Sequence, residues 1–229
     1  MRKIRFVQQI LILICLCVGS NQMDAKTISL DMANPTYKLQ KKDIQVNKLI
    51  VTGTINRNTI NTILDLYPNV ENLDLLNSKI VAYTDTMHVV YPANEIYAGA
   101  FSKKNKIKKV ILPHALIKIG KGAFWSCTGL ESIVFPSTIT VIDRFAFQHC
   151  VKLKSITLPE NLQSIGGATF SGCQSLSTVK CLSKNPPKMP EWNPFDDIKS
   201  TDLIIYVPAQ SLKNYKNIPF LKNFTIMAL

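Results

Sequence analysis

Two consecutive stretches of the chain decide its fold: residues 119–142 read IGKGAFWSCTGLESIVFPSTITVI and residues 142–165 read IDRFAFQHCVKLKSITLPENLQSI. Both follow the pattern I-x-x-x-A-F-x-x-C-x-x-L-x-x-I-x-[LF]-P-x-x-[LI]-x-x-I, so the same residue types return every 23 positions. A fixed period of about 20–50 residues indicates a repeat architecture. The sequence therefore predicts a stack of similar units.

The 23-residue step continues on both sides of these two units. It connects five columns, which are Phe101, Phe124, Phe147 and Phe170; Cys127, Cys150 and Cys173; Leu130, Leu153 and Leu176; Pro113, Pro136 and Pro159; and Ile96, Ile119, Ile142 and Ile165. We predict that the Phe, Cys and Leu columns form the structural core of the repeat. Because a unit this short cannot enclose a core alone, neighbouring units must stack as coils, with strands about 4.8 Å apart.

Each unit predicts two local structures. Over residues 130–136 apolar residues alternate with small or polar ones, which is typical of a short strand with one face in the core. Pro136 ends this strand because it has no N–H to donate. The Ala-Phe-x-x-Cys segment is too short for a full helix, so we expect a helical or 3-10 turn on the opposite wall, with Phe and Cys pointing inward.

The pattern resembles the BspA-like leucine-rich repeats, which are common in surface proteins of Bacteroidetes and some mucosal protists. In ordinary leucine-rich repeats an Asn or Cys follows the strand, whereas here Pro136 follows it and Cys127 precedes it. The resemblance covers roughly residues 45–229. It implies an α/β fold: a right-handed leucine-rich-repeat solenoid with its parallel β-sheet on the concave side, a short helical, 3-10 or irregular convex side, and capped ends.

The sequence before the regular repeats extends the resemblance. Residues 48–53 (KLIVTG) resemble an opening strand, and residues 55–67 have a helical apolar period that Pro68 ends. Residues 70–80 (VENLDLLNSKI) repeat the strand spacing, but the next strand comes 37 residues later instead of 23. We therefore expect a 14-residue insertion, within residues 81–94, that forms a loop at one edge of the stack.

At the other end, four Pro within residues 184–195 break the period. Residues 203–208 (LIIYVP) predict a last strand, which gives seven rungs, and residues 211–224 resemble the terminal cap of this family. Caps are needed because the end coils would otherwise expose core. The expected divisions are a cleaved signal peptide (1–25), an N-terminal cap and first coils with the insertion (26–95), coils of period 23 (96–182) and a C-terminal cap (183–229), the last three forming one continuous solenoid domain.

The first 25 residues have the features of a secretory signal peptide. A positively charged start precedes an unbroken apolar run over residues 10–18, and small residues follow. Nine apolar residues rise only ~14 Å as a helix against a hydrocarbon core of ~30 Å, which disfavours a permanent span. A lipid anchor is also disfavoured because Cys15 and Cys17 follow large residues. We expect an exported protein without a transmembrane span in its mature chain, at the cell surface or outer membrane, in the periplasm, or secreted.

Composition narrows the class of partner. Hydrophobic residues make up 46% of the chain, which excludes wholesale disorder, and 27 Lys and Arg against 15 Asp and Glu give a net charge of +12. The excess is almost entirely lysine, with 23 Lys against 4 Arg. Arginine is the residue that pairs with guanine edges and phosphates in a fork, so nucleic acid is not the expected partner. We expect a protein or glycan at the cell surface instead.

Motifs that carry chemistry are missing from the sequence. It contains no G-x-S-x-G, P-loop, H-E-x-x-H or C-x-x-C, and His149 beside Cys150 has no second ligand pair at a fixed spacing. We therefore predict no metal, no cofactor and no enzymatic activity. Stacked coils would bring the Cα atoms of the Cys column to about 5 Å, but three thiols cannot all pair and their Cβ vectors run parallel. Buried apolar thiols are favoured, and bridged or redox-active thiols are the alternative.

Two surfaces are candidates for binding. Strand alternation places eight side chains on the outer face of the sheet: Lys109, Ile111, Ser132, Val134, Ser155, Thr157, Thr178 and Lys180. The second candidate is the basic patch formed by Lys103, Lys104, Lys106 and Lys108, which would suit sulfated glycans, anionic lipopolysaccharide or an acidic protein. The alternative for each is an ordinary solvated surface. Because Lys104 takes the place of a column Cys, we also expect looser packing of that coil.

These observations predict a non-catalytic binding module. The family resemblance implies adhesion to a host matrix protein, another cell or a glycan, and known members include binders of fibronectin and fibrinogen. A structural or accessory component of the bacterial envelope, packed against a companion protein, is the alternative. An enzyme with an unrecognised site is a third hypothesis, which hydrolysis of a polymer by the purified chain would support.

Overall fold

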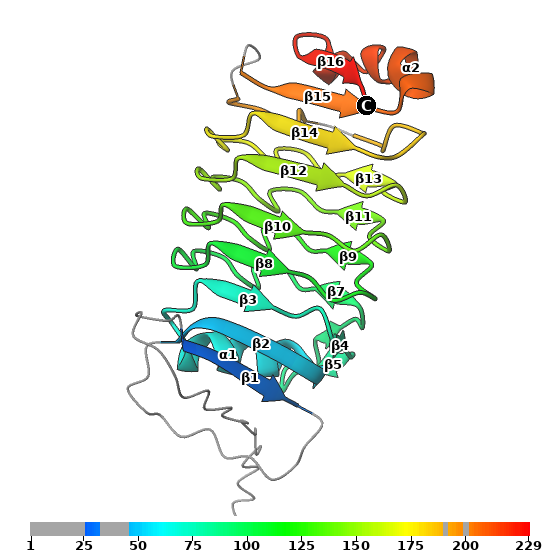
Figure 1. Ribbon diagram of the computed structural model, residues 1–229. Coiled ribbons are helices and arrows are strands. Elements are labelled where there is room, and N and C mark those ends of the chain that lie inside the picture. The colour runs from blue at the N-terminus through cyan, green and yellow to red at the C-terminus, as the bar shows by residue number, and fades with distance from the viewer. Residues whose placement is uncertain (1–25, 33–45, 190–191, 199–201) are drawn as a thin grey trace, which may run out of the picture.

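The computed structural model describes residues 26–32, 46–189, 192–198 and 202–229. The predicted signal peptide, residues 1–25, lies outside the described residues. The chain winds into a stack of coils, with parallel strands as the rungs on one wall and shorter strands on a second wall (Figure 1). This confirms the leucine-rich-repeat solenoid expected from the 23-residue period.

The first wall is a row of parallel strands in two consecutive hydrogen-bonded sheets, divided between residues 134 and 155, which we call together the main sheet. Its strands, in spatial order, are β1 (Lys26–Asp31), β2 (Val46–Ile55), β3 (Asn72–Asp74), β8 (Lys109–Ile111), β10 (Ser132–Val134), β12 (Ser155–Leu158), β14 (Thr178–Cys181), β15 (Ile204–Val207) and β16 (Thr225–Ala228). Ser132 lies opposite Lys109 and Ser155 lies opposite Thr178, so the register follows the 23-residue step. The seven predicted rungs are present, and β1 and β16 add one at each end.

The second wall is also a parallel sheet, which sequence reasoning did not anticipate. Its two-residue strands are β7 (Glu95–Ile96), β9 (Lys118–Ile119), β11 (Val141–Ile142) and β13 (Ser164–Ile165). Strands this short show no alternation in the sequence, so only the Ile column marked them. The predicted 3-10 turns follow each strand: the Cys127 amide donates to the Phe124 carbonyl at 3.1 Å, three residues back.

The column residues form the core. Four aromatic rings of the Phe column are buried and stack with centroids 4.8, 5.1 and 5.6 Å apart, and Phe195 extends the stack at 5.4 Å. Cys127, Cys150 and Cys173 are buried and free of disulfides, as expected for apolar fillers. Each thiol also donates a hydrogen bond to the Phe carbonyl of the preceding coil, at 2.9–3.2 Å.

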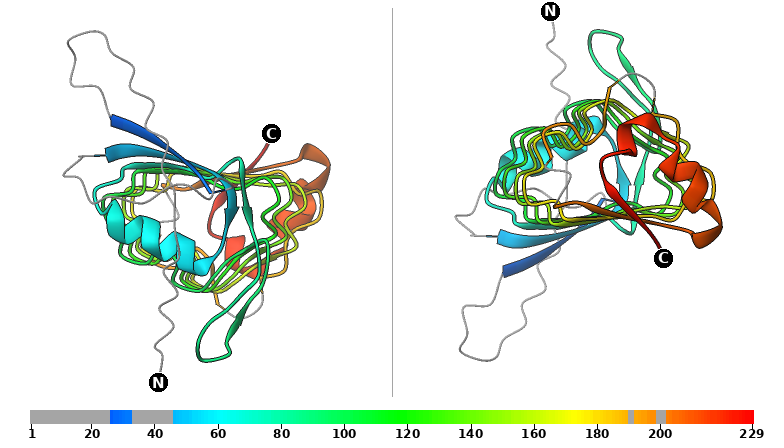
Figure 2. Two further views of the ribbon diagram at one scale, coloured as in Figure 1. Left: turned by 90° about the horizontal axis from the view of Figure 1, so that it is seen from below. Right: turned by 90° about the horizontal axis from the view of Figure 1, so that it is seen from above.

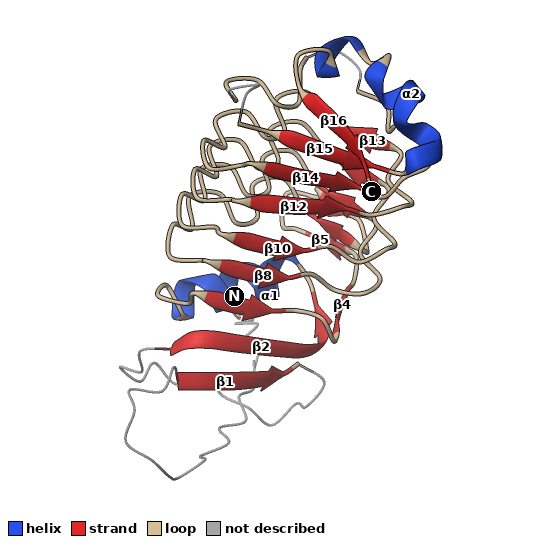
Figure 3. Cartoon of the chain, turned by 45° about the horizontal axis from the view of Figure 1, so that its top comes forward, coloured by secondary structure: helices blue, strands red, loops and turns tan. Residues whose placement is uncertain are grey.

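Helices occur at the two ends of the stack (Figure 3). Near the N-terminal end, α1 (Arg57–Leu66) begins after Asn56, whose side chain accepts from the Thr59 amide, and buries one apolar face. At the C-terminal end, η1 (Ala209–Ser211), α2 (Leu212–Lys216) and η2 (Pro219–Leu221) cover the last coil with the buried side chains of Tyr215 and Leu221. The position of α1 agrees with the helix predicted within residues 55–67, and the three C-terminal helices lie within the segment predicted as a cap.

The insertion is a β-hairpin. After β4 (Ser78–Ile80), which pairs with the end of β2, come β5 (Tyr83–Thr84) and β6 (Val90–Tyr91), which pair antiparallel. Figure 2 shows this green loop extending beyond the outline of the coils, on the side away from β1 and β2. The edge loop expected within residues 81–94 is therefore an ordered hairpin.

Candidate binding surface

The outer face of the main sheet carries the predicted side chains in two columns. Lys109, Ser132, Ser155 and Thr178 form one column, and Ile111, Val134, Thr157 and Lys180 form the other. Each of these side chains is at least partly exposed, and Val134 keeps 47% of its surface accessible. The alternation that placed them there is confirmed by the buried residues between them, such as Val110 and Ile156.

The two columns continue beyond the eight predicted residues. The added side chains are Lys48, Asn72, Ile204 and Thr225 in the first column and Ile50, Asp74, Tyr206 and Met227 in the second. The same alternation in β2 and β15 would have identified several of them. Outside the regular repeats, however, the 23-residue period does not predict which residues of neighbouring strands lie opposite each other. We call the sixteen side chains together the sheet face. Its charged residues lie mainly at the N-terminal end and its larger apolar residues at the C-terminal end.

The sheet face is shallow. One open hollow of about 330 Å³ lies beside the ends of β10 and β12, where Val134 and Thr157 meet Leu182. A second hollow of about 330 Å³ is lined by Lys48, Asp74, Lys109 and neighbours on β2, β3 and β8. Small-molecule sites are usually enclosed clefts that bury most of the ligand. A broad face with shallow hollows instead suits the surface of a macromolecule.

The basic patch is partly neutralised. Lys108 Nζ lies 2.8 Å from Glu71 Oε1, and this hydrogen bond raises the pKa of Lys108. Lys104, which takes the place of a column Cys, is half-buried. Its Nζ atom is 3.9 Å from Asp65 Oδ1 on α1. Lys103 Nζ lies 4.9 Å from the centre of the Trp125 ring. These neighbours make the patch a weaker candidate for anion binding than the sequence indicated.

The buried thiols have a chemistry suited to packing. Burial raises the pKa of Cys127 from its usual 9.0 to about 12, and the hydrogen bond with Cys173 raises that of Cys150. At neutral pH these thiols stay protonated, whereas nucleophilic cysteines need a thiolate. Cys181 lies 3.0 Å from the Tyr215 hydroxyl, which joins the last regular coil to the cap. Among the residues that the structure describes, no three His, Cys, Asp or Glu side chains are grouped to hold a metal ion.

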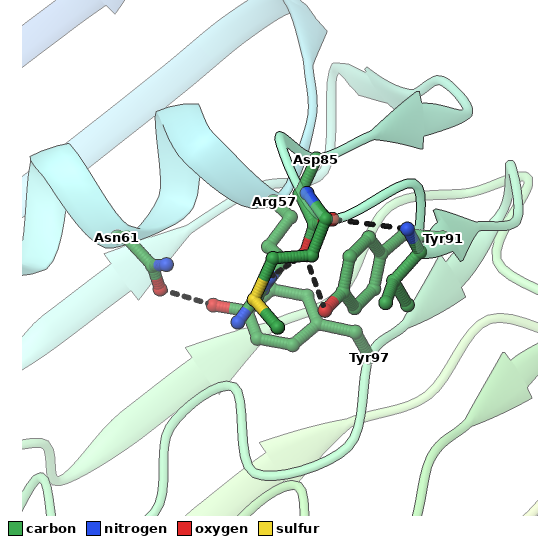
Figure 4. A network of polar contacts seen from close by, with 7 residues as sticks. Arg57, Asn61, Asp85, Tyr91 and Tyr97 are labelled. Atoms are coloured by element: carbon green, nitrogen blue, oxygen red, sulfur yellow. Dashed lines mark hydrogen bonds and ion pairs between the residues drawn. The ribbon is translucent and has the colours of Figure 1, made fainter.

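A polar network anchors the inserted hairpin (Figure 4). Arg57 on α1 places Nη1 3.2 Å from Asp85 Oδ2, and the Tyr91 hydroxyl donates to the same oxygen at 3.3 Å. The Arg57 guanidinium lies 4.2 Å above the Tyr91 ring and 5.4 Å from the Tyr97 ring. The Tyr97 hydroxyl in turn donates to Asn61. The sequence did not reveal this network because its members come from separate parts of the chain.

The fold and the sheet face define a solenoid repeat protein of the leucine-rich-repeat class. The model of the BspA-type leucine-rich repeat region matches residues 94–224 with six copies. The chain therefore belongs to the BspA-type leucine-rich repeat family, whose repeats are binding scaffolds. No curated protein sequence matches the chain.

Several solved structures are similar to the chain. A leucine-rich repeat protein from Bacteroides capillosus is 31% identical over 44% of this chain and 71% of its own, with a TM-score of 0.37. The T. pallidum leucine-rich repeat protein is 21% identical over 91% of this chain and 77% of its own, with a TM-score of 0.48. The pneumococcal vaccine antigen PcpA is 18% identical over 80% of this chain and 57% of its own, with a TM-score of 0.44. Because these scores are low, family membership rests on the repeat model. Within the described residues, no helix is long and apolar enough to cross a membrane.

Proposed function

We propose that this protein is an exported adhesion module that binds a macromolecule at the cell surface through the sheet face. The sheet face is the observation that carries the proposal. Its two columns run in register over β2, β3, β8 and β10 and again over β12, β14, β15 and β16, and every member is at least partly exposed. Repeat proteins use extended surfaces of this kind to bind partners through many modest contacts.

A protein ligand fits this surface better than a small molecule. Eight strands about 4.8 Å apart span about 34 Å, a length that suits contact with a macromolecule better than with a small molecule. Exposed Val134 lies at the centre and exposed Met227 at the C-terminal end, and Lys109 and Lys180 flank the centre. Such a surface supports apolar anchoring with charge at its margin. The candidate ligands are host matrix proteins and proteins or glycans of another cell.

Charge reversal separates the sheet face from the basic patch. Fibronectin, fibrinogen and a panel of cell-surface glycans would be immobilised, and binding of the purified protein measured by surface plasmon resonance. We expect saturable binding that weakens about tenfold or more when Lys109→Glu and Lys180→Glu are combined. The matched variant Lys103→Glu with Lys104→Glu should change it little. Equal losses in both variants, or no saturable binding, would overturn the proposal.

An envelope component is the second candidate function, and the inserted hairpin favours it. Met87 in the turn of the hairpin is 79% exposed and Val90 on β6 is 65% exposed, although Arg57 holds the turn through Asp85. An exposed apolar tip on an anchored element suits docking against a companion protein. This function predicts stable copurification with an envelope protein, lost when Met87→Ser and Val90→Ser are combined. Copurification that survives these substitutions would exclude the hairpin as the docking element.

A further inference from the structure

Two further hollows lie along the second wall, and Glu160 lines both the larger of them and the sheet-face hollow beside β10 and β12. Two hollows, of about 220 and 600 Å³, follow β11 and β13 where the chain segment after β14 packs against them. Both hollows are lined by Val141 and Ser164, so they are neighbours, and we call them together the groove. The sequence analysis marked this segment only as the point where four Pro break the period.

An exposed aromatic side chain forms one end of the groove. Trp192 lines the smaller hollow and keeps 53% of its surface accessible. Gly167 makes room for it, because a Cβ atom at Gly167 would lie 2.9 Å from the Trp192 Cβ and 3.4 Å from its ring. The corresponding positions one and two coils earlier carry Arg144 and Lys121. The glycine that lets the indole pack this closely is therefore present in this coil and absent from the two preceding ones.

A second aromatic residue lies beside Trp192. Phe145 has a φ of 61°, and the equivalent positions of the other coils, Gly99, Gly122 and Ala168, also have a positive φ. The backbone conformation is therefore a property of the repeat, and only the aromatic side chain is particular to this coil. The centre of the Phe145 ring lies 6.0 Å from the centre of the Trp192 ring. Lys121 Nζ lies 6.0 Å from the centre of the Phe145 ring.

The rest of the groove is polar and electrically balanced. Its ionisable lining residues are Asp143, Glu160, Arg144 and Lys188, two of each sign. Asn161, Gln163 and Asn185 add side-chain amides, which can both donate and accept hydrogen bonds. Lys118 Nζ lies 3.9 Å from Asp143 Oδ2 and Lys121 lies beside Phe145, so these two lysines add positive charge next to the balanced lining.

A peptide strand does not suit the groove. Ile165 on β13 donates to the Lys188 carbonyl at 2.9 Å, and the Lys188 amide donates to the Gln163 carbonyl at 2.8 Å. On its other side β13 pairs with β11. Because both backbone edges of β13 already have partners, an extended peptide cannot add to this sheet as another strand.

We propose that this groove binds a neutral oligosaccharide. A pyranose ring presents C–H groups on its face and hydroxyl groups around its edge. The C–H face would stack on the Trp192 indole, and the hydroxyl groups would exchange hydrogen bonds with the amides and with Asp143 and Arg144.

Tryptophan fluorescence tests the proposal directly because the chain has two Trp residues, Trp125 and Trp192. In the variant Trp125→Phe, emission reports on Trp192 alone. It would be titrated with hexasaccharides of glucose, mannose and N-acetylglucosamine, and with a heparin hexasaccharide. We expect a saturable blue shift with at least one neutral hexasaccharide and none with heparin. No shift with any neutral sugar up to about 10 mM, or a shift with heparin alone, overturns the proposal.

Two further variants separate recognition from folding. Phe145→Gly places glycine where the preceding coils have it, so the protein should stay folded while its affinity for the neutral hexasaccharide falls about fivefold or more. Gln163→Ala keeps the backbone bond to Lys188 and should also weaken binding. Lys180→Glu on the sheet face is the matched control and should leave sugar affinity unchanged. Unchanged affinity in both Phe145→Gly and Gln163→Ala would contradict the assignment of the groove.

Discussion

The repeated residues act through contacts between equivalent positions of successive coils. Phe124 stacks on Phe101 with the ring planes 7° apart, and the Cys127 thiol donates to the Phe101 carbonyl. A Cys fits here because it is small and apolar and can still satisfy a buried carbonyl. The thiol column is therefore part of the packing, and its protonation state is coupled to folding.

The first prediction concerns alkaline pH. The folded pKa of Cys127, about 12, exceeds its unfolded value of 9.0, and that of Cys150 is also raised. Their contribution to stability is complete below about pH 9 and is lost as pH rises towards 12, because the unfolded chain loses the protons first. Urea unfolding at pH 10 should give a free energy lower by about 1 kcal/mol through Cys127 than at pH 7, and Cys150 should add to this loss. The variant Cys127→Ala should have a shallower pH dependence, and an identical one would contradict the argument.

The second prediction compares two glycines. A Cβ atom at Gly129 would lie 2.1 Å from the backbone oxygen of Asn105 in the preceding coil, whereas one at Gly99 would meet nothing within 4 Å. Gly99→Ala should cost about 1 kcal/mol because only its positive φ opposes alanine. Gly129→Ala should cost roughly 3 kcal/mol or more because the backbones of two coils must separate. Chemical denaturation measures both, and equal costs would show that the coils are not packed this closely.

Among the elements, the regular coils were predictable and the irregular contacts were not. The 23-residue period predicted the main-sheet strands, their inward-facing residues and the turns, because every regular coil has the same local structure. The helix α1 followed from its apolar spacing, with Ile60, Ile63 and Leu64 buried as expected. The second sheet was missed because two-residue strands have no periodic signal.

The sheet face was predicted in its middle and missed at its ends. Alternation alone fixed which side chains point outward from β8 to β14, but Tyr206 and Met227 follow a break in the period. The groove at Trp192 was also missed, since it depends on contact with Gly167, 25 residues earlier in the chain. Contacts of this kind arise from tertiary packing that no local pattern records.

The third prediction concerns the hairpin of β5 and β6. Asp85 Oδ1 accepts from the Met87 and Val89 amides at 2.9 and 3.0 Å, while Oδ2 faces Arg57. Arg57→Met keeps much of the side-chain length and removes the ion pair. We expect faster hydrogen exchange within residues 83–91, unchanged exchange in β10 and a small change in Tm, because the hairpin lies outside the stack. Unchanged exchange in the hairpin would show that Arg57 does not anchor it.

The carboxyl of Asp85 adds a pH dependence at the same element. The amide of Val89 is the main cause that holds the pKa of Asp85 below its usual 3.8. The resulting stabilisation is present above about pH 4 and is lost as pH falls through the lower folded pKa. Hairpin exchange, corrected for its intrinsic pH dependence, should therefore accelerate in acid before that of the main sheet.

At the scale of the whole molecule, the stack is nearly one-dimensional. Each coil contacts its neighbours, the two ends are covered by α1 and by the C-terminal helices, and the side walls remain available (Figures 1 and 3). The excess of lysine is spread over these walls and not gathered at one deep site. None of the sixteen side chains of the sheet face lines the two hollows beside Trp192.

Site-specific photocrosslinking tests the central claim, which is that the sheet face binds a macromolecule. A photoreactive residue would replace Thr157, at the middle of the sheet face, or exposed Ala98, outside it, and each variant would be irradiated with envelope and host-matrix extracts. We predict a discrete adduct from position 157 that excess unlabelled protein competes away and that Lys109→Glu with Lys180→Glu abolishes, with none from position 98. Equal adducts from both positions, or a discrete adduct from position 98 alone, would contradict the claim.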